Sequence, residues 1–155
     1  MGFWQTILDG FTEQTTEEPL VNKKLGLVPA LSEWRPGFVE KRWPVDPELF
    51  HGNALFGGHI SAIADQVLGL AAMTVLEDDC FFGTANMSIS YLSPVTGGEL
   101  VAQGVVIDQR SKSMYVECTF FVGEKVVAKA SATQVVNKRK PNKGSVKGGI
   151  KSTAN

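Results

Sequence analysis

Two glycines and one carboxylate stand close together in a long apolar stretch of the chain. Gly57 and Gly58 open this stretch, and Asp65 follows seven residues after the second glycine. The first turn of a helix has backbone N–H groups without intrahelical acceptors, and glycine lets a ligand approach them closely. A carboxylate can attack a carbonyl carbon or activate water against it. These residue types therefore fit hydrolysis at a carbonyl group.

Each of these residues also has a structural interpretation. The glycines could serve tight packing at a helix entry, and Asp65 could bond to Ser61 or to a neighbouring strand. A buried aspartate is nevertheless rare unless it is paired or functional. On a helix, Asp65 shares its side with the small residues Ser61 and Gly69, which leaves room for a ligand. We therefore favour the catalytic interpretation, in which Asp65 is a desolvated carboxylate at a site.

The spacing of the two groups limits how they can cooperate. In a helix, seven residues separate Gly58 from Asp65 by about 10 Å along the axis. Side chains lean back toward the helix N-terminus, but an aspartate recovers only a few ångströms in this way. One carbonyl carbon therefore cannot contact both groups of a single chain. The spacing predicts a homodimer in which the glycines of one subunit face Asp65 of the other, across antiparallel helices.

The stretch that carries these residues reads as one helix over residues 57–76. Its apolar positions recur at helical spacing, and the opposite side is small and apolar too. A helix that is apolar nearly all round is expected to be enclosed by other elements. Asp65 and Gln66 near its middle argue against a membrane span, so we expect no membrane association.

The elements around this helix alternate with a period of two. Long strands are predicted at residues 82–92, 99–109, 113–122 and 126–136, and the short turns between them make neighbours antiparallel. Residues 25–43 read as a hairpin or an edge pair, and residues 3–11 as a short amphipathic helix. The prediction is an α+β fold in which a curved antiparallel sheet of about five or six strands wraps one long buried helix.

Length and charge fit a single domain with a basic tail. We expect residues 1–136 to form the domain, and residues 137–155, with six basic residues and no acid, to be a flexible tail. The rest of the chain carries 9 basic and 16 acidic residues, which argues against nucleic acid as a partner. Two cysteines, Cys80 and Cys118, are too few for a disulfide framework, and no export signal is evident, so a cytoplasmic location is expected.

The order of these motifs resembles the hotdog-fold acyl-CoA thioesterases, most closely their phenylacetate-degradation (PaaI-like) branch. Three segments match that family in order: the glycine pair with its aspartate, "TANMSISYLSPV" at residues 84–95, and "VVAKASAT" at residues 126–133. The match spans about residues 45–136. Two positions depart from the family: Phe56 stands where a histidine usually precedes the glycines, and Phe50 where an asparagine is usual.

The resemblance implies hydrolysis of an acyl-CoA to free acid and CoA by a homodimer that is often doubled to a homotetramer. It implies that Asp65 is the nucleophile or general base and that the Gly57 and Gly58 amides bind the oxyanion. Thr84 falls where the family often has a serine or threonine that positions water; an ordinary strand residue is the alternative. Asn86, two residues on, is expected on the same strand face, to support Thr84 or to cap an edge.

Other residues are candidates for binding the substrate. Phe56 could line an apolar acyl pocket, and three polar residues near the glycines could replace the missing family groups: His51, Asn53 and His59. Arg110 and Lys112 lie in a predicted turn and could bind the CoA phosphates, although solvated turn charges are as good an interpretation. No His/Cys/Asp cluster has metal-site spacing, and no cofactor other than the CoA of the substrate is expected.

Two rival functions share this fold. A hydratase or dehydratase acting on an acyl-thioester would need His51 or His59 close to a carboxylate. An acyl-CoA-binding protein without catalysis would keep the pocket and tolerate the loss of Asp65.

Overall fold

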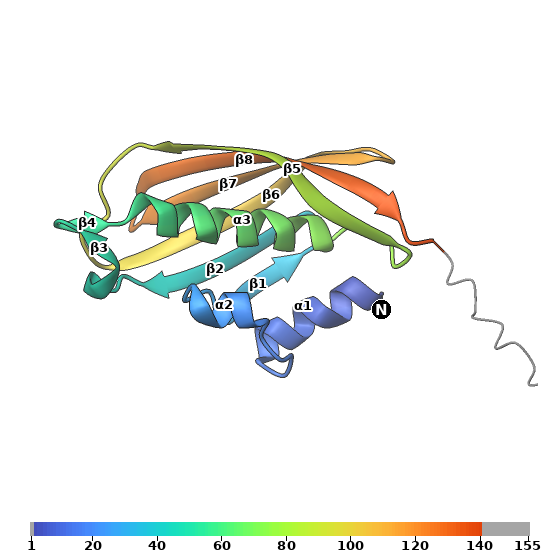
Figure 1. Cartoon of the computed structure of the whole chain (residues 1–155), viewed down its shortest axis with the longest axis horizontal. Helices are drawn as coiled ribbons and strands as arrows, with labels where there is room; N and C mark the ends of the chain where they lie inside the picture. The colour runs from blue at the N-terminus through green and yellow to red at the C-terminus, as the bar shows by residue number, and fades with distance from the viewer. Residues whose placement is uncertain (1, 141–155) are drawn as a thin grey trace, which may run out of the picture.

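A curved antiparallel sheet of six strands packs against one long helix (Figure 1). The computed structural model describes residues 2–140, so most of the predicted tail lies outside the described residues. The strand order is β1-β2-β6-β7-β8-β5, which makes β1 and β5 the two edges. The six strands are β1 (Leu31–Arg35), β2 (Phe38–Pro44), β5 (Cys80–Tyr91), β6 (Glu99–Gln109), β7 (Ser113–Val122) and β8 (Lys125–Lys138). The predicted α+β class, strand positions and edge hairpin are confirmed.

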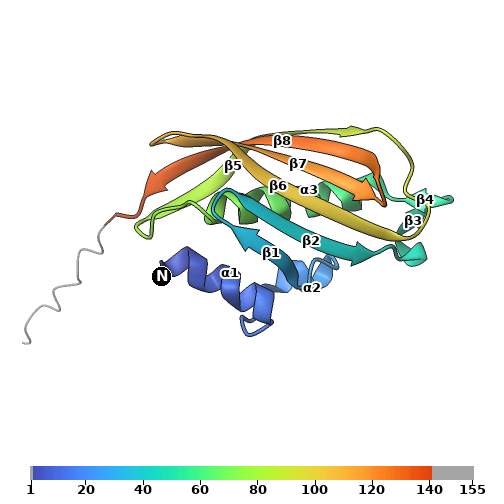
Figure 2. The same cartoon turned by 180° about the vertical axis from the view of Figure 1, so that it is seen from behind.

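The long helix α3 covers Gly57–Met73 and lies across the concave face of the sheet, as the views from both sides show (Figures 1 and 2). It ends three residues earlier than predicted. The Thr74 hydroxyl donates to the Ala71 carbonyl at 2.7 Å and accepts from the Gly37 amide at 2.8 Å. This serine/threonine-type bond back to the helix competes with a further helical turn.

The core is formed by the alternating inner residues of the sheet and the apolar side of α3. In β7, every second residue is buried, as the period of two predicts: Met114, Val116, Cys118 and Phe120. Gly104 on β6 lies directly under α3, where an added Cβ would meet both the Val67 carbonyl oxygen and Val67 Cγ1 at 3.0 Å. The absence of a side chain at Gly104 therefore sets how closely α3 approaches the sheet.

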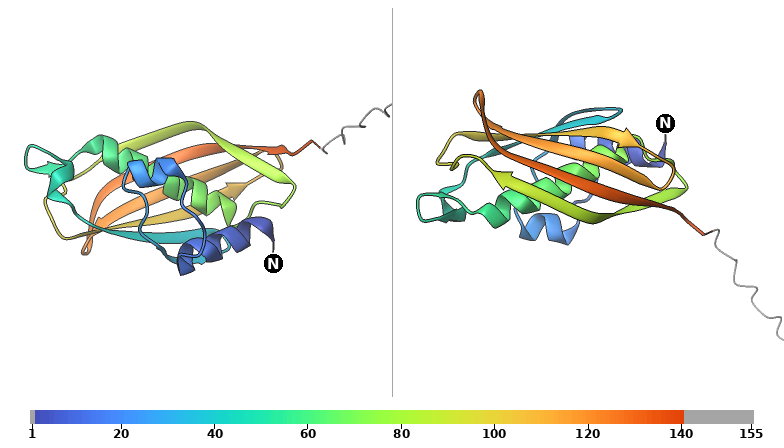
Figure 3. Two further views of the ribbon diagram at one scale, coloured as in Figure 1. Left: turned by 60° about the horizontal axis from the view of Figure 1, so that its bottom comes forward. Right: turned by 90° about the horizontal axis from the view of Figure 1, so that it is seen from above.

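The prediction that α3 is enclosed on all sides is wrong for the single chain. The sheet buries one side of the helix, but a stripe on the opposite side stays exposed or half-buried: Gly58, Ser61, Ala62, Asp65 and Gly69. The sheet has only one concave face, and the N-terminal helices cover only part of the length of α3 (Figure 3). The open stripe faces the same side as β5, whose outer edge has no strand partner among residues 2–140.

Two short helices precede the sheet. Helix α1 (Phe3–Glu13) was predicted, whereas α2 (Leu20–Lys24) was not. Helix α1 contacts β1 and α3, and its Trp4 Nε1 donates to the Cys80 carbonyl at 3.2 Å. The Trp34 indole donates to Asp9 at 2.9 Å and fixes the other side of α1. These contacts place α1 beside α3 and over the start of β5.

The segment before α3 contains short regular elements. Helix η1 (Pro47–Leu49) is capped by Asp46, whose side chain accepts from the Glu48 amide at 2.9 Å. Strands β3 (Phe50–His51) and β4 (Ala54–Leu55) then form a small separate hairpin. The Phe56 amide donates to the Leu49 carbonyl at 2.9 Å, which fixes the point where α3 starts. No helix among residues 2–140 is long and apolar enough to cross a membrane.

The close approach at Gly104 generates a stability prediction. We expect Gly104→Ala to lower the free energy of unfolding by about 1–3 kcal/mol, because the new methyl group must push α3 away from the sheet. Gly97→Ala is the matched control, since a Cβ at Gly97 meets no atom within 4 Å. Urea denaturation of both variants checks this, and equal stability of the two would contradict it.

Candidate functional site

The carboxylate of Asp65 contacts the hydroxyl of Thr84. Thr84 Oγ1 lies 3.2 Å from Asp65 Oδ1 and 3.0 Å from Oε1 of Gln134. Asp65 comes from the middle of α3, Thr84 from the edge strand β5 and Gln134 from β8. The predicted candidates Asp65 and Thr84 are thus brought together, and the sequence did not point to Gln134.

The prediction that Asp65 is desolvated is wrong within one chain. Asp65 and Thr84 are both exposed, because they lie on the open side of α3 beside the free edge of β5. Gln134, in contrast, is completely buried beneath them. The single chain therefore holds the carboxylate from below and leaves it accessible from outside.

Asp65 and Thr84 line a cavity of about 450 Å³ between α3 and the N-terminal helices. Most of its wall is apolar and is formed by Trp4, Ile7, Phe11, Leu31, Leu70, Met73 and Phe82. Gly69 lies one turn after Asp65, and a Cβ there would touch the Phe82 ring at 3.4 Å. A cavity of this size and lining suits an apolar group attached to a reacting carbonyl near Asp65.

A buried lysine also lines this cavity. Lys41 on β2 is 3% exposed, and its Nζ donates to the Leu27 carbonyl and to Gln66 Oε1, each at 2.9 Å. Burial lowers the pKa of Lys41 to about 8, although the carboxylate of Glu18 acts in the opposite direction. The sequence analysis missed Lys41. Its position between Val39 and Trp43 in an alternating strand was the signal that it points inward.

The glycine pair starts α3 with free amides. Among residues 2–140, the Gly57 and Gly58 amides have no hydrogen-bond acceptor, whereas the His59 amide donates to the Phe56 carbonyl at 3.0 Å. Tyr91 packs over this turn: its hydroxyl donates to the Gly57 carbonyl at 2.8 Å and contacts the Ser61 hydroxyl. Tyr91 was part of the sequence motif without a role, and the structure gives it one in fixing the helix start.

Both glycines are also required by packing. A Cβ at Gly57 would meet the Tyr91 ring at 3.2 Å, and one at Gly58 would meet the Phe56 ring at 2.5 Å. The structural interpretation of the glycines and their suitability for anion binding are therefore compatible, because one small residue serves both.

The polar residues expected to replace the missing family groups are placed unequally. His51 and Asn53 are exposed on the β3–β4 hairpin, and the His51 ring stacks on Phe56 with centroids 6.3 Å apart. His59 points the other way, with Nε2 3.0 Å from the Leu25 carbonyl, and lines a different pocket that contains Trp43 and Leu100. Within one chain, neither histidine lies in the Asp65 cavity.

Asn86 was expected on the same strand face as Thr84, and this prediction is wrong. A bulge interrupts β5, so that Thr84 pairs with Gln134 while Asn86 pairs with Thr133. Adjacent residues of β8 point to opposite faces, and their partners do the same. Thr84 therefore faces α3 and Asn86 faces outward, which leaves the edge role for Asn86.

The two candidate phosphate ligands lie in the β6–β7 turn, outside the Asp65 cavity. Arg110 Nε donates to Asp108 Oδ2 at 2.7 Å, and this pairing raises the pKa of Arg110. Arg110 is mostly exposed, as is Lys112. Both are free to meet a solute, and their role in binding CoA stays a prediction.

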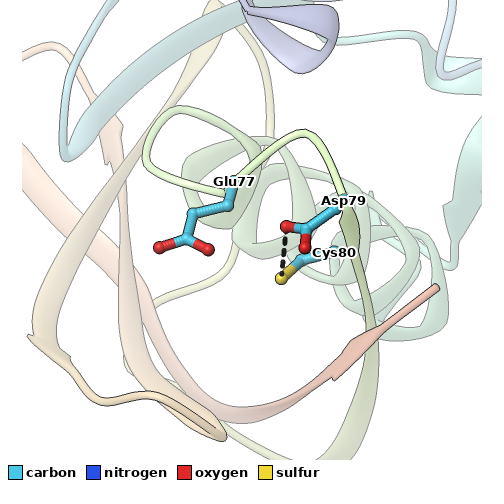
Figure 4. A group of neighbouring side chains, drawn as sticks. All are labelled: Glu77, Asp79 and Cys80. Atoms are coloured by element: carbon cyan, nitrogen blue, oxygen red, sulfur yellow. Dashed lines mark hydrogen bonds between the residues drawn. The ribbon is translucent and has the colours of Figure 1, made fainter. Parts of the chain in front are cut away.

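A small acidic group lies at the end of α3, away from Asp65 (Figure 4). Possible ligand atoms of Glu77, Asp79 and Cys80 lie within 4.8 Å of one another. Asp79 also pairs with Lys138 at 3.5 Å and accepts the weak Cys80 hydrogen bond at 3.6 Å. Burial and these acidic neighbours raise the pKa of the Cys80 thiol, which makes Cys80 a poor nucleophile.

Comparison with known families decides where this arrangement belongs. The sequence model of the thioesterase superfamily matches residues 52–135, which include the glycine pair, Asp65, Thr84 and Gln134. The chain belongs to the thioesterase superfamily. The resemblance to hotdog thioesterases predicted from the sequence is thereby confirmed. A comparison with curated proteins gives no match.

Solved structures show the same fold. A phenylacetic acid degradation-related protein from Ralstonia eutropha has a TM-score of 0.74 at 22% identity, covering 86% of this chain and 99% of its own. A thioesterase from Haemophilus influenzae has a TM-score of 0.74 at 20% identity, covering 88% and 94%. A Streptococcus mutans protein bound to acetyl-CoA has a TM-score of 0.64 at 26% identity, covering 71% and 90%. These similarities confirm the hotdog architecture of this thioesterase-superfamily chain.

The pKa of Lys41 generates a prediction on pH and stability. Between about pH 8 and 10.5, folded Lys41 has lost its proton while an unfolded lysine keeps it, so stability rises with pH over this range. We expect the wild type to gain about 2 kcal/mol in free energy of unfolding between pH 7.5 and 9.5 relative to Lys41→Met. Urea denaturation at both pH values measures this. The exposed Lys129→Met is the control and should keep the wild-type gain.

Proposed function

We propose that this protein hydrolyses an acyl-CoA thioester to the free acid and CoA, at sites that two copies of the chain share. The observation that carries the proposal is the Asp65 carboxylate, bonded by Thr84 at the mouth of an apolar cavity in a thioesterase-superfamily chain. The acetyl-CoA bound to the Streptococcus mutans neighbour supports CoA as part of the substrate. No cofactor is part of the proposed reaction.

The reaction needs a carboxylate and an oxyanion site on the same thioester carbon. In the proposal, the thioester oxygen accepts hydrogen bonds from the Gly57 and Gly58 amides, whose N–H groups have no acceptor in the described part of one chain. Asp65 removes a proton from the water that attacks the carbon, or attacks the carbon itself and forms a mixed anhydride that water then hydrolyses to the free acid, which regenerates Asp65. The C–S bond then breaks, and CoA leaves as a thiol after taking up a proton. The apolar acyl group occupies the cavity lined by Phe11, Leu70 and Phe82.

The shared site follows from helix geometry and from two exposed surfaces. Gly58 and Asp65 stand about 10 Å apart along α3. The open stripe of α3 adjoins β5, a 12-residue strand whose outer edge is unpaired among residues 2–140. Tyr91 and Leu92, at the end of this strand, are 50% and 58% exposed. A long free edge with exposed apolar residues beside an open helix stripe is suited to pairing with a second copy.

The hydratase or dehydratase alternative has less support in this geometry. It needs an imidazole next to a carboxylate, and neither His51 nor His59 lies in the cavity of Asp65 within one chain. The thiol-release experiment below distinguishes the binding-protein alternative from a thioesterase, because a protein that only binds acyl-CoA would release no thiol.

The role of Asp65 is tested by substitution with its uncharged isostere. Asp65→Asn keeps the shape of the side chain but cannot act as nucleophile or base, so we expect kcat/KM to fall at least about 100-fold. The measurement is release of free thiol from a panel of acyl-CoAs. Glu124→Gln, in the exposed β7–β8 turn, is the control and should retain wild-type activity. Unchanged thiol release by Asp65→Asn would exclude the proposed role.

The shared site is tested by mixing two inactive variants. Asp65→Asn removes the carboxylate, and Gly58→Val blocks approach to the amide at the start of α3. A mixed dimer would contain one site with both groups intact, so co-expression should restore about a quarter of wild-type activity. Each variant co-expressed with itself is the control. If the site were contained in one chain, the mixture would stay as inactive as its components.

A further inference from the structure

The hydrogen-bonding groups next to Asp65 are not all satisfied in the arrangement of Thr84 and Gln134. The Thr84 hydroxyl has one hydrogen, yet its oxygen lies within hydrogen-bond distance of two acceptors, Asp65 Oδ1 at 3.2 Å and Gln134 Oε1 at 3.0 Å. The other end of the same amide, Gln134 Nε2, is buried without a partner among residues 2–140. A completely buried N–H donor without an acceptor lowers stability more than one at the surface, because no solvent water can accept its hydrogen bond.

Turning the Gln134 amide by half a rotation resolves the first conflict. Nε2 then donates to Thr84 Oγ1, and the hydroxyl donates its own hydrogen to Asp65. The group left without a partner is now a carbonyl oxygen, which proteins tolerate in their interior more readily than an unpaired N–H. The hydroxyl oxygen keeps one lone pair free to accept from a water molecule.

We infer that Gln134 is a positioning residue for the reaction: its side-chain amide donates to Thr84 and thereby commits the Thr84 hydroxyl to Asp65. This inference rests on the proposed function of Asp65. Without the donor on β8, the Thr84 hydroxyl is free to rotate away from the carboxylate. With it, one carboxylate oxygen is held by Thr84, and the other oxygen is left to react.

The position of Gln134 in the fold supports this assignment. On β8, the residues that face α3 are otherwise apolar, with Ala130, Ala132 and Val136 all buried. A glutamine in this row brings a polar group into the core, and the contact it makes is with Thr84. The β5 bulge after Thr84 leaves Thr84 paired with Gln134 while the next residues shift register.

The test uses Gln134→Met, which nearly conserves volume and removes both polar atoms. We expect kcat for thiol release to fall about tenfold, the loss of one hydrogen bond to a reacting group, with KM within twofold of wild type. Folding should not suffer, because the variant also removes an unpaired buried polar atom. Met114→Leu is the matched control. Met114 pairs with Gln134 from β7, on the side away from Thr84, and its variant should keep the wild-type kcat.

A double-mutant cycle separates positioning from a structural effect. Thr84→Val already removes the hydroxyl that would link Gln134 to Asp65. Adding Gln134→Met to this variant should therefore lower kcat by less than twofold. If the two substitutions instead multiply, Gln134 does not act through Thr84 and the inference is overturned. It is also overturned if Gln134→Met has wild-type kcat.

Gln134→Glu gives a second, pH-dependent readout. A protonated carboxyl can donate its O–H to Thr84, whereas an ionised one can only accept and adds a charge near Asp65. The kcat of Gln134→Glu relative to wild type should therefore fall as pH rises, and a ratio that rises or stays flat contradicts the inference. If Asp65→Asn and wild type hydrolyse acyl-CoA equally, the proposed function and this inference fail together. If only the Gln134 variants behave as wild type, the inference alone fails.

Discussion

The rise of an α-helix, 1.5 Å per residue, limits what a single copy of this chain can do. It separates the free amides at the start of α3 from the Asp65 carboxylate by about 10 Å, and no rotamer of an aspartate closes that gap. In our proposal, the open stripe of α3 and the free edge of β5 are therefore parts of one surface, completed by a second copy.

The sheet gives the carboxylate its immediate surroundings. Thr84 reaches Asp65 because β5 lies beside α3 at the edge of the sheet, and Gln134 reaches Thr84 because β8 is the neighbouring strand. A polar residue in an otherwise apolar row weakens the core unless its hydrogen bonds are made. In our inference, Gln134 weakens the core in this way but holds the Thr84 hydroxyl toward Asp65.

About half of the residues that line the cavity beside Asp65 lie outside the region that matches the superfamily. That region starts at residue 52, whereas Trp4, Ile7, Phe11 and Leu31 close the cavity from the N-terminal side. In the proposed reaction, α1 and the segments around it therefore help to determine which acyl group fits, while Asp65 and Thr84 come from the region that matches the superfamily. Lys41 adds a buried amine with a lowered pKa to this wall, next to Gln66.

The sequence by itself determined the periodic features of this protein. Alternation in β6, β7 and β8, the long apolar helix, and the short turns fixed the α+β class, because these patterns depend only on local geometry. The spacing of Gly58 and Asp65 likewise gave their separation, since helical rise is the same everywhere. Only the tertiary structure decided which side of α3 stays open, because that depends on how far the sheet and α1 extend. It also decided the face of Asn86, which a one-residue bulge in β5 reversed, and the contacts of Lys41 and Gln134. Bulges and buried polar contacts arise from pairing between distant strands, and no local period records them.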